Sequence, residues 1–236
     1  MNDIPYNDLL GCLLWIALHT RPDVAQSVGV LCRFASNPGL QHWTGLKRIL
    51  RYLAHTKNYG IRYSSSSQAL FGYCDSDYAN CPDTRRSTTG YCFIQASGPV
   101  SWKSKLQKSR GSLPGVATSS VAAEYQALYD ASREAAWLRQ LYEGLGFPLT
   151  APTVIRGDNQ GSISMTKNHR TDSLTKHISV KYHYTRELVK LQQINVEYCE
   201  TSAMVADFLT KPTTAQKFLW CRQHLGIVDF SQPASV

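Results

Sequence analysis

The sequence predicts an α/β fold in which helices pack on a mixed β-sheet, preceded by a small helical segment. Three observations favour this fold. Residues 1–63 carry apolar side chains at helical spacing. From about residue 68, short segments rich in β-branched and aromatic residues are separated by turn residues, and later strand candidates alternate with helix candidates. Three antiparallel strands followed by strand–helix crossovers give a mixed sheet covered by helices.

The first segment is predicted to contain three helices, over residues 7–19, 22–35 and 40–55. In the third of them, Trp43, Leu46 and Leu53 recur at helical steps and share one face. The serine run at 64–67 marks a boundary. We therefore expect a helical segment at 1–63, a main domain at 68–212, and a C-terminal helix and tail at 213–236.

The main domain is predicted to start with three strands and a long helix. Ser119 or Ser120 is suited to cap that helix, and Gly146 with Pro148 ends it. The strands are expected at 70–74, 87–95, 99–103, 153–157 and 194–199. Shorter helices are expected at 159–166, 177–190 and 203–209.

The charge balance and the cysteines narrow the function classes. The formal net charge is +8, from 25 Lys and Arg against 17 Asp and Glu, which favours a polyanionic partner such as nucleic acid. The seven cysteines are odd in number and form no CxxC pair, so the pattern predicts neither a zinc knuckle nor a disulfide framework. No stretch of eighteen apolar residues occurs, and we expect no membrane span.

Four carboxylates occupy places typical of a metal site. Asp75 and Asp158 are expected at strand ends, Glu124 in the first turns of the long helix, and Asp207 in a late short helix. Converging acids repel one another unless cations neutralise them, and hard divalent ions prefer oxygen ligands. Two such ions about 4 Å apart hold and activate a phosphodiester. Asp77 competes with Asp75 for the role of the acid on the first strand, because alternate residues of a strand share a face.

A series of motifs resembles the successive signatures of copia-type RNase H domains, in the same order over 71–212. The motifs run from YCDSDYA at 73–79 and RRSTTGY at 85–91 through SWKSK at 101–105 and AEY at 123–125 to DNQ at 158–160, TKHI at 175–178 and ADFLTKP at 206–212. The earlier TRPD at 20–23 and the stretch at 42–53 resemble the region between polymerase and RNase H in the same polyproteins.

The resemblance implies an RNase H-like fold, a five-stranded mixed sheet flanked by helices, and cleavage of the RNA strand of RNA–DNA hybrids by a two-metal mechanism. It implies that Asp75 and Asp158 bridge two Mg²⁺ ions (Mn²⁺ is the alternative), that Glu124 ligates from the helix, and that Asp207 completes the second site. Segment 1–63 would be the C-terminal part of a reverse transcriptase. The implied partner is the polymerase part of the same Pol polyprotein, and the implied location is a cytoplasmic virus-like particle.

Basic side chains near the strands are candidates for phosphate contacts that do not read sequence. They are Arg85, Arg86, Lys103, Lys105 and Lys176. We expect Trp102 to fill the core rather than to stack on bases.

Departures from the family pattern keep other hypotheses open. Ala122 stands where the family has a second glutamate, residues 106–118 include an insertion, and no histidine lies in the loop before Asp207. A degenerate remnant that binds nucleic acid without cutting it is the first alternative. An unrelated α/β domain, whose acids lie apart and serve structural roles, is the second.

Overall fold

The computed structural model describes residues 4–65, 68–108, 119–167 and 179–231. The helical segment comprises α1 (Tyr6–His19), the 3₁₀ turn η1 (Pro22–Val24), α2 (Ala25–Cys32) and α3 (Leu40–His55). The single helix predicted over 22–35 is therefore wrong at both ends. It begins as a 3₁₀ turn at Pro22, and after Cys32 the amides of Arg33 and Phe34 bond to carbonyls three residues back, which closes tight turns instead of helix.

The main sheet has five strands in the order β4-β3-β2-β5-β6. β2 (Phe71–Asp77), β3 (Thr88–Gln95) and β4 (Gly98–Leu106) are antiparallel neighbours, whereas β5 (Thr153–Gly157) runs parallel to β2 and β6 (Ile194–Tyr198) runs parallel to β5. This mixed sheet confirms the predicted RNase H-like α/β fold. β2 and β4 extend farther than the sequence predicts, so Asp75 lies inside a strand and not at its end.

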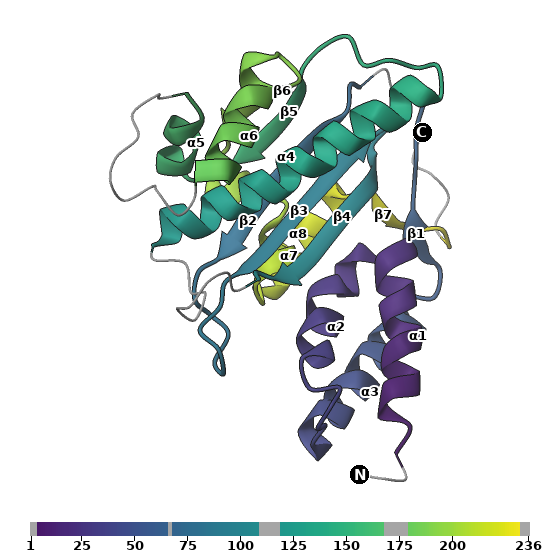
Figure 1. Cartoon of the computed structure of the whole chain (residues 1–236). Coiled ribbons are helices and arrows are strands. Elements are labelled where there is room, and N and C mark those ends of the chain that lie inside the picture. Colours follow the sequence, from purple (N-terminus) through teal and green to yellow (C-terminus); the bar gives the residue numbers. More distant parts are fainter. Residues whose placement is uncertain (1–3, 66–67, 109–118, 168–178, 232–236) are drawn as a thin grey trace.

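Helices cover both faces of this sheet (Figure 1). α4 (Ser120–Gly144), α5 (Gln160–Lys167) and α6 (Ser179–Lys190) lie over one face. The opposite face carries α7 (Asp207–Thr210), α8 (Ala215–His224) and the N-terminal helices. The Ser119 hydroxyl accepts a hydrogen bond from the Ala122 amide and so caps α4, which agrees with one of the two predicted caps.

Side chains of β3 alternate between two hydrophobic cores. Tyr91 and Phe93 face α4, whereas Cys92 and Ile94 face the core that the N-terminal helices, α7 and α8 share. Trp102 packs against this second core, and its Nε1 donates to the carbonyl oxygen of Ala17 at 2.8 Å. The predicted packing role of Trp102 is confirmed, and the bond ties the sheet to α1.

Two short elements were not predicted. β1 (Tyr59–Ile61) pairs antiparallel with β7 (Ile227–Asp229), so the end of the helical segment is bonded to the strand that follows α8.

The short helix predicted at 203–209 is instead a 3₁₀ turn, η3 (Thr201–Ala203), followed by α7. The predicted helix at 177–190 agrees with α6 from Ser179 onward, and its first two residues lie outside the described part of the chain.

Candidate metal and active site

Two neighbouring parallel strands carry Asp75 and Asp158 to the same place. In the register of β2 and β5, Tyr73 lies beside Arg156, and each aspartate follows two residues later on its own chain. Glu124 reaches the same point from the first turns of α4. One carboxylate oxygen from each of the three residues lies within 4.8 Å of the other two. The fold thus brings three of the four predicted acids together.

Burial makes this group of acids electrostatically unfavourable without a cation. Asp75 is 1% exposed, and burial raises its pKa to about 6, while the nearby Lys211 and the hydroxyl of Thr210 act in the opposite direction. Burial, followed by the negative charges of Asp75 and Asp158, raises the pKa of Glu124 well above the usual carboxyl range. Asp75 and Glu124 therefore hold their protons more strongly than carboxyl groups in water do.

This donor set fits a hard divalent ion. It offers carboxylate oxygens alone, close enough together for one ion to contact all three residues. A bound cation would favour the ionised forms that burial and mutual repulsion disfavour. Asp77, the competing candidate on β2, instead accepts a hydrogen bond from the side-chain amide of Asn80 in the turn after the strand.

The fourth predicted acid, Asp207, is engaged elsewhere. Its side chain is buried, and Oδ1 lies 2.9 Å from Lys211 Nζ while Oδ2 lies 3.5 Å from Lys217 Nζ. Lys211 Nζ also lies 3.8 Å from Oδ2 of Asp75, an oxygen to which the Thr210 hydroxyl donates. Asp207 is thus connected to Asp75 through a lysine and is not part of the three-acid group.

Lys211 and Thr210 are site residues that the sequence analysis missed. A usable signal was present for the lysine, since Asp207 and Lys211 are four residues apart, a spacing at which opposite charges pair on a helix. The pKa of Lys211 is raised, because the attraction of Asp75 and Asp207 outweighs the opposing effect of its burial.

Gly90 sets how closely α7 approaches the sheet. It lies opposite Asp75 on β3. A Cβ at this position would stand 2.6 Å from Cγ2 of Thr210 and 2.9 Å from Cβ of Leu209. The missing side chain therefore lets α7 bring Thr210 against Asp75.

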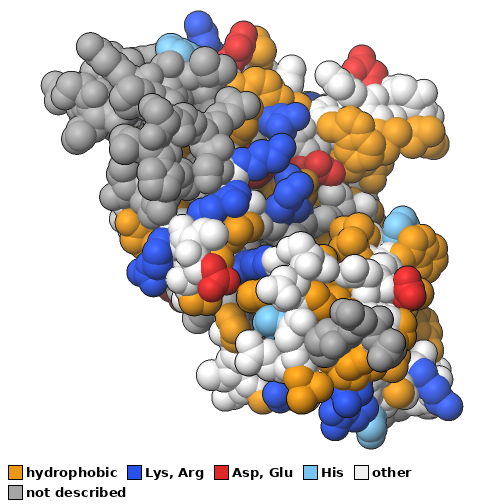
Figure 2. Space-filling model, turned by 60° about the horizontal axis from the view of Figure 1, so that its bottom comes forward, with side chains coloured by type: hydrophobic (Ala, Val, Ile, Leu, Met, Phe, Trp, Pro, Cys, Tyr) orange, Lys and Arg blue, Asp and Glu red, His pale blue; other side chains and the backbone are white. Residues whose placement is uncertain are grey.

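The predicted phosphate-binding residues are in different situations. Arg85 and Lys105 are exposed, whereas the guanidinium group of Arg86 donates to the carbonyl oxygen of Gln107, and Lys103 Nζ lies 5.5 Å from the centre of the Tyr91 ring. Lys176 lies outside the described residues. Figure 2 shows Lys and Arg side chains gathered near the centre of one face of the molecule.

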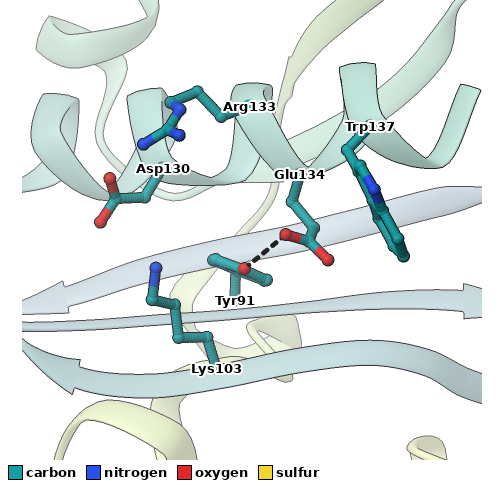
Figure 3. Close-up of a pocket in the computed structure, with 6 residues that line it drawn as sticks. All are labelled: Tyr91, Lys103, Asp130, Arg133, Glu134 and Trp137. Carbon is teal, nitrogen blue, oxygen red and sulfur yellow. Dashed lines mark hydrogen bonds between the residues drawn. The ribbon is translucent and has the colours of Figure 1, made fainter. Parts of the chain in front are cut away.

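A separate pocket of about 420 Å³ lies between α4 and strands β3 and β4 (Figure 3). Its central carboxylate, Glu134, accepts hydrogen bonds from Tyr91 at 2.9 Å and from Ser101 at 2.6 Å. Glu134 lies ten positions after Glu124 along α4, so this pocket and the three-acid group are different places on the same helix. Its other charged groups have neighbours as well: Asp130 accepts a hydrogen bond from Gln126, Lys103 lies over the Tyr91 ring and Arg133 lies over the Tyr129 ring.

The sheet topology and the clustered acids together define an RNase H-like domain with a centre suited to cations. No protein-family model matches the chain. Its sequence is 39% identical over 227 residues to a retrovirus-related Pol polyprotein from transposon TNT 1-94 of Nicotiana tabacum, a match that covers 96% of this chain and 17% of that protein. Close relatives of the chain are thus copia-type retrovirus-related Pol polyproteins of transposons, and its main domain has an RNase H-like fold.

Other relatives differ in length. The chain is 37% identical over 223 residues to the Pol polyprotein from transposon RE1 of Arabidopsis thaliana, covering 94% of this chain and 15% of that protein. It is also 45% identical over 139 residues to the secreted RxLR effector protein 161 of Plasmopara viticola, covering 58% of this chain and 94% of that protein. The chain thus spans about a sixth of the length of the Pol polyproteins it matches.

Solved structures show weaker similarity. LC11-RNase H1 isolated from compost gives a TM-score of 0.43 at 16% identity, covering 60% of this chain and 91% of that chain. A foamy viral protease–reverse transcriptase in complex with double-stranded DNA gives a TM-score of 0.46 at 13% identity. That match covers 83% of this chain and 32% of the viral chain. The similarity to Pol polyproteins and the grouping of three of the four acids speak against the hypothesis of an unrelated domain whose acids lie apart.

Proposed function

We propose that this domain is a metal-dependent nuclease that hydrolyses the RNA strand of RNA–DNA hybrids within a retrotransposon Pol polyprotein. The observation that carries the proposal is the meeting of Asp75, Glu124 and Asp158 within 4.8 Å, on an RNase H-like fold. A partly buried group of acids that is costly without a cation is typical of sites that use one. Mg²⁺ is the proposed ion, with Mn²⁺ as a substitute, since both take oxygen ligands.

The residues of the chain have distinct proposed roles. Asp75, Glu124 and Asp158 hold the cation, which on binding supplies Lewis-acid activation of the phosphate and of the attacking water. Exposed Arg85 and Lys105 attract the phosphate backbone without reading sequence, and Arg86 and Lys103 shape the surface around them. The 2′-hydroxyl groups and the groove of the hybrid distinguish RNA from DNA.

The assignment of Asp207 as a further ligand depends on Lys211. For Asp207 to hold an ion together with Asp75, the ammonium group that lies 2.9 Å and 3.8 Å from their oxygens would have to leave. The two-ion arrangement implied by the family resemblance therefore competes with this lysine for the same two carboxylates.

The proposed partners are the hybrid and the polymerase part of the same polyprotein, and the proposed location is a cytoplasmic virus-like particle. The structural support for a larger assembly is a set of exposed apolar side chains on α1: Trp15 is 61% exposed and Leu18 is 55% exposed. Among the described residues, every helix is too short or too polar to cross a membrane.

The experiment that tests this function offers the purified chain four substrates of one sequence: an RNA–DNA hybrid, single-stranded RNA, duplex RNA and duplex DNA. We expect cleavage of the RNA in the hybrid with Mg²⁺ and none after chelation. If the chain binds the hybrid in Mg²⁺ or Mn²⁺ but leaves the RNA intact, the non-catalytic remnant is the correct reading.

A further inference from the structure

The contacts of Lys211 differ from those of an ordinary surface lysine. Its ammonium group lies 2.9 Å from Oδ1 of Asp207 and 3.8 Å from Oδ2 of Asp75. The side chains of these aspartates are 6% and 2% exposed, whereas that of Lys211 is 36% exposed. An exposed ion pair contributes little because water solvates both charges, but two buried carboxylates need a cation near them. Lys211 supplies that positive charge from the solvent side.

The second lysine on Asp207 has a different role. Lys217 Nζ donates hydrogen bonds to the carbonyl oxygens of Thr201 at 3.0 Å and Ser202 at 2.7 Å, and its distance to Asp207 is the longer one, 3.5 Å. These bonds fasten α8 to η3. Lys211, in contrast, pairs with Asp75 and Asp207, which lie more than 130 residues apart along the chain.

Lys211 and a second divalent ion would need the same oxygens. A magnesium ion shared by Asp75 and Asp207 would lie about 2.0–2.1 Å from an oxygen of each, in the space that the ammonium group approaches. The two cations would also repel each other at that distance. Occupation by Lys211 leaves Asp75, Glu124 and Asp158 to bind an ion on the other side.

We propose that the ammonium group of Lys211 is a built-in cation between Asp75 and Asp207, so that this site binds one divalent ion instead of two. The inference rests on the proposed nuclease function and specifies how many ions it uses. The single ion binds at Asp75, Glu124 and Asp158, and Lys211 presents a fixed positive charge beside it, where it faces the phosphate of a bound strand.

The test counts bound ions with Mn²⁺ alone, by calorimetry and by the electron paramagnetic resonance of free Mn²⁺. We expect one ion per chain for the wild type and for Lys211→Arg, and two for Lys211→Met. Lys57→Met removes the same charge at an exposed position in the turn after α3 and is expected to keep one bound ion. Two ions on the wild type, or one ion on Lys211→Met, would overturn the proposal.

A second measurement covers the case in which Lys211→Met folds poorly. In chelator, the unfolding temperature of Lys211→Met should fall below that of Lys57→Met. Mn²⁺ should raise the unfolding temperature of Lys211→Met by more than that of the wild type, because the metal replaces a lost charge. Equal shifts for the two variants would contradict the built-in cation. The proposal for Lys211 and the nuclease proposal fail in different ways. Two ions on the wild type together with hybrid cleavage reject only the role of Lys211. Absence of any bound ion rejects the metal site itself.

Discussion

The hydroxyl group of Tyr52 donates a hydrogen bond of 2.6 Å to Oδ2 of Asp23, a carboxylate that Arg21 also holds with two hydrogen bonds. The Arg21 guanidinium group further donates to the backbone oxygen of Thr56, and Arg222 of α8 donates to the Tyr52 hydroxyl at 3.2 Å. These bonds join η1, α3 and α8. The network gives a physical reason for the TRPD motif at 20–23: it fastens the helical segment to the C-terminal helix.

Removing the charge of Asp23 should destabilise the protein strongly. Asp23→Asn leaves the buried Arg21 guanidinium without its counter-charge, and we expect a loss of about 3–5 kcal/mol in the free energy of unfolding. Urea unfolding followed by tryptophan fluorescence measures it. Asp8→Asn, an exposed substitution of the same kind in α1, should cost no more than about 1 kcal/mol. Equal losses for the two variants would show that the network contributes nothing specific.

A methyl group at Gly90 should force α7 away from the sheet. Gly90→Ala places a Cβ 2.6 Å from Thr210 and 2.9 Å from Leu209, and overpacking of this kind costs about 1–3 kcal/mol. The matched control is Gly11→Ala, which meets nothing within 4 Å inside α1 and should stabilise by about 0.5–1 kcal/mol. Thermal unfolding of both variants checks the opposite signs, and a neutral Gly90→Ala would contradict the close packing of α7.

The clustered acids should make stability depend on pH when no metal is present. Burial raises the pKa of Asp75 to about 6 and that of Glu124 higher still, from ordinary values near 4. Between pH 4 and the raised values the native state holds protons that the unfolded chain has released, so stability falls as pH rises.

Unfolding in chelator between pH 4 and pH 8 measures this dependence. Glu124→Gln should make it less steep, because the substituted side chain does not titrate. Added Mg²⁺ should remove most of the fall, because the ion binds the ionised acids. A wild-type profile as flat as that of Glu124→Gln would be inconsistent with a raised pKa at this site.

Lys105 should contribute to hybrid binding through charge alone. Removing one phosphate contact lowers the slope of log binding constant against log salt by roughly one. Lys105→Ala should show this change without altering the preference among hybrid sequences, whereas Lys57→Ala, on the exposed turn after α3, should leave the slope as it is. Fluorescence anisotropy over a salt series provides the values. An unchanged slope for Lys105→Ala removes this residue from the proposed interface.

Much of the fold could be predicted because its signals are local. Turn residues separate the strands, and Ser119 caps α4 through a bond to an amide three residues away. β1 and β7 could not be predicted, since each has three residues and its partner lies more than 160 residues away. Pairing over such a distance depends on the packing of α3 and α8, which no short window of sequence contains.

The candidate site also has residues that local sequence signals predict and residues that they do not. Asp75 and Asp158 could be found because both follow strand candidates and both lie in motifs that occur in the family order. The position of Asp207 could not, because the direction of its side chain depends on Lys211 and on the close approach that Gly90 permits. The extent of β2 was also underestimated, since Ser76 and Asp77 are polar residues that the pairing with Thr89 and Thr88 holds in the strand.

The central claim is that Asp75, Glu124 and Asp158 hold a divalent ion for hydrolysis of RNA in a hybrid. The most direct test is the cleavage rate of labelled RNA in a hybrid with Mg²⁺, compared between wild type, Asp75→Asn and Asp77→Asn. Stabilisation of the transition state by the metal is worth several kcal/mol, so Asp75→Asn should slow cleavage at least roughly a hundredfold. Asp77→Asn should cleave at nearly the wild-type rate. Equal rates for wild type and Asp75→Asn would contradict the claim.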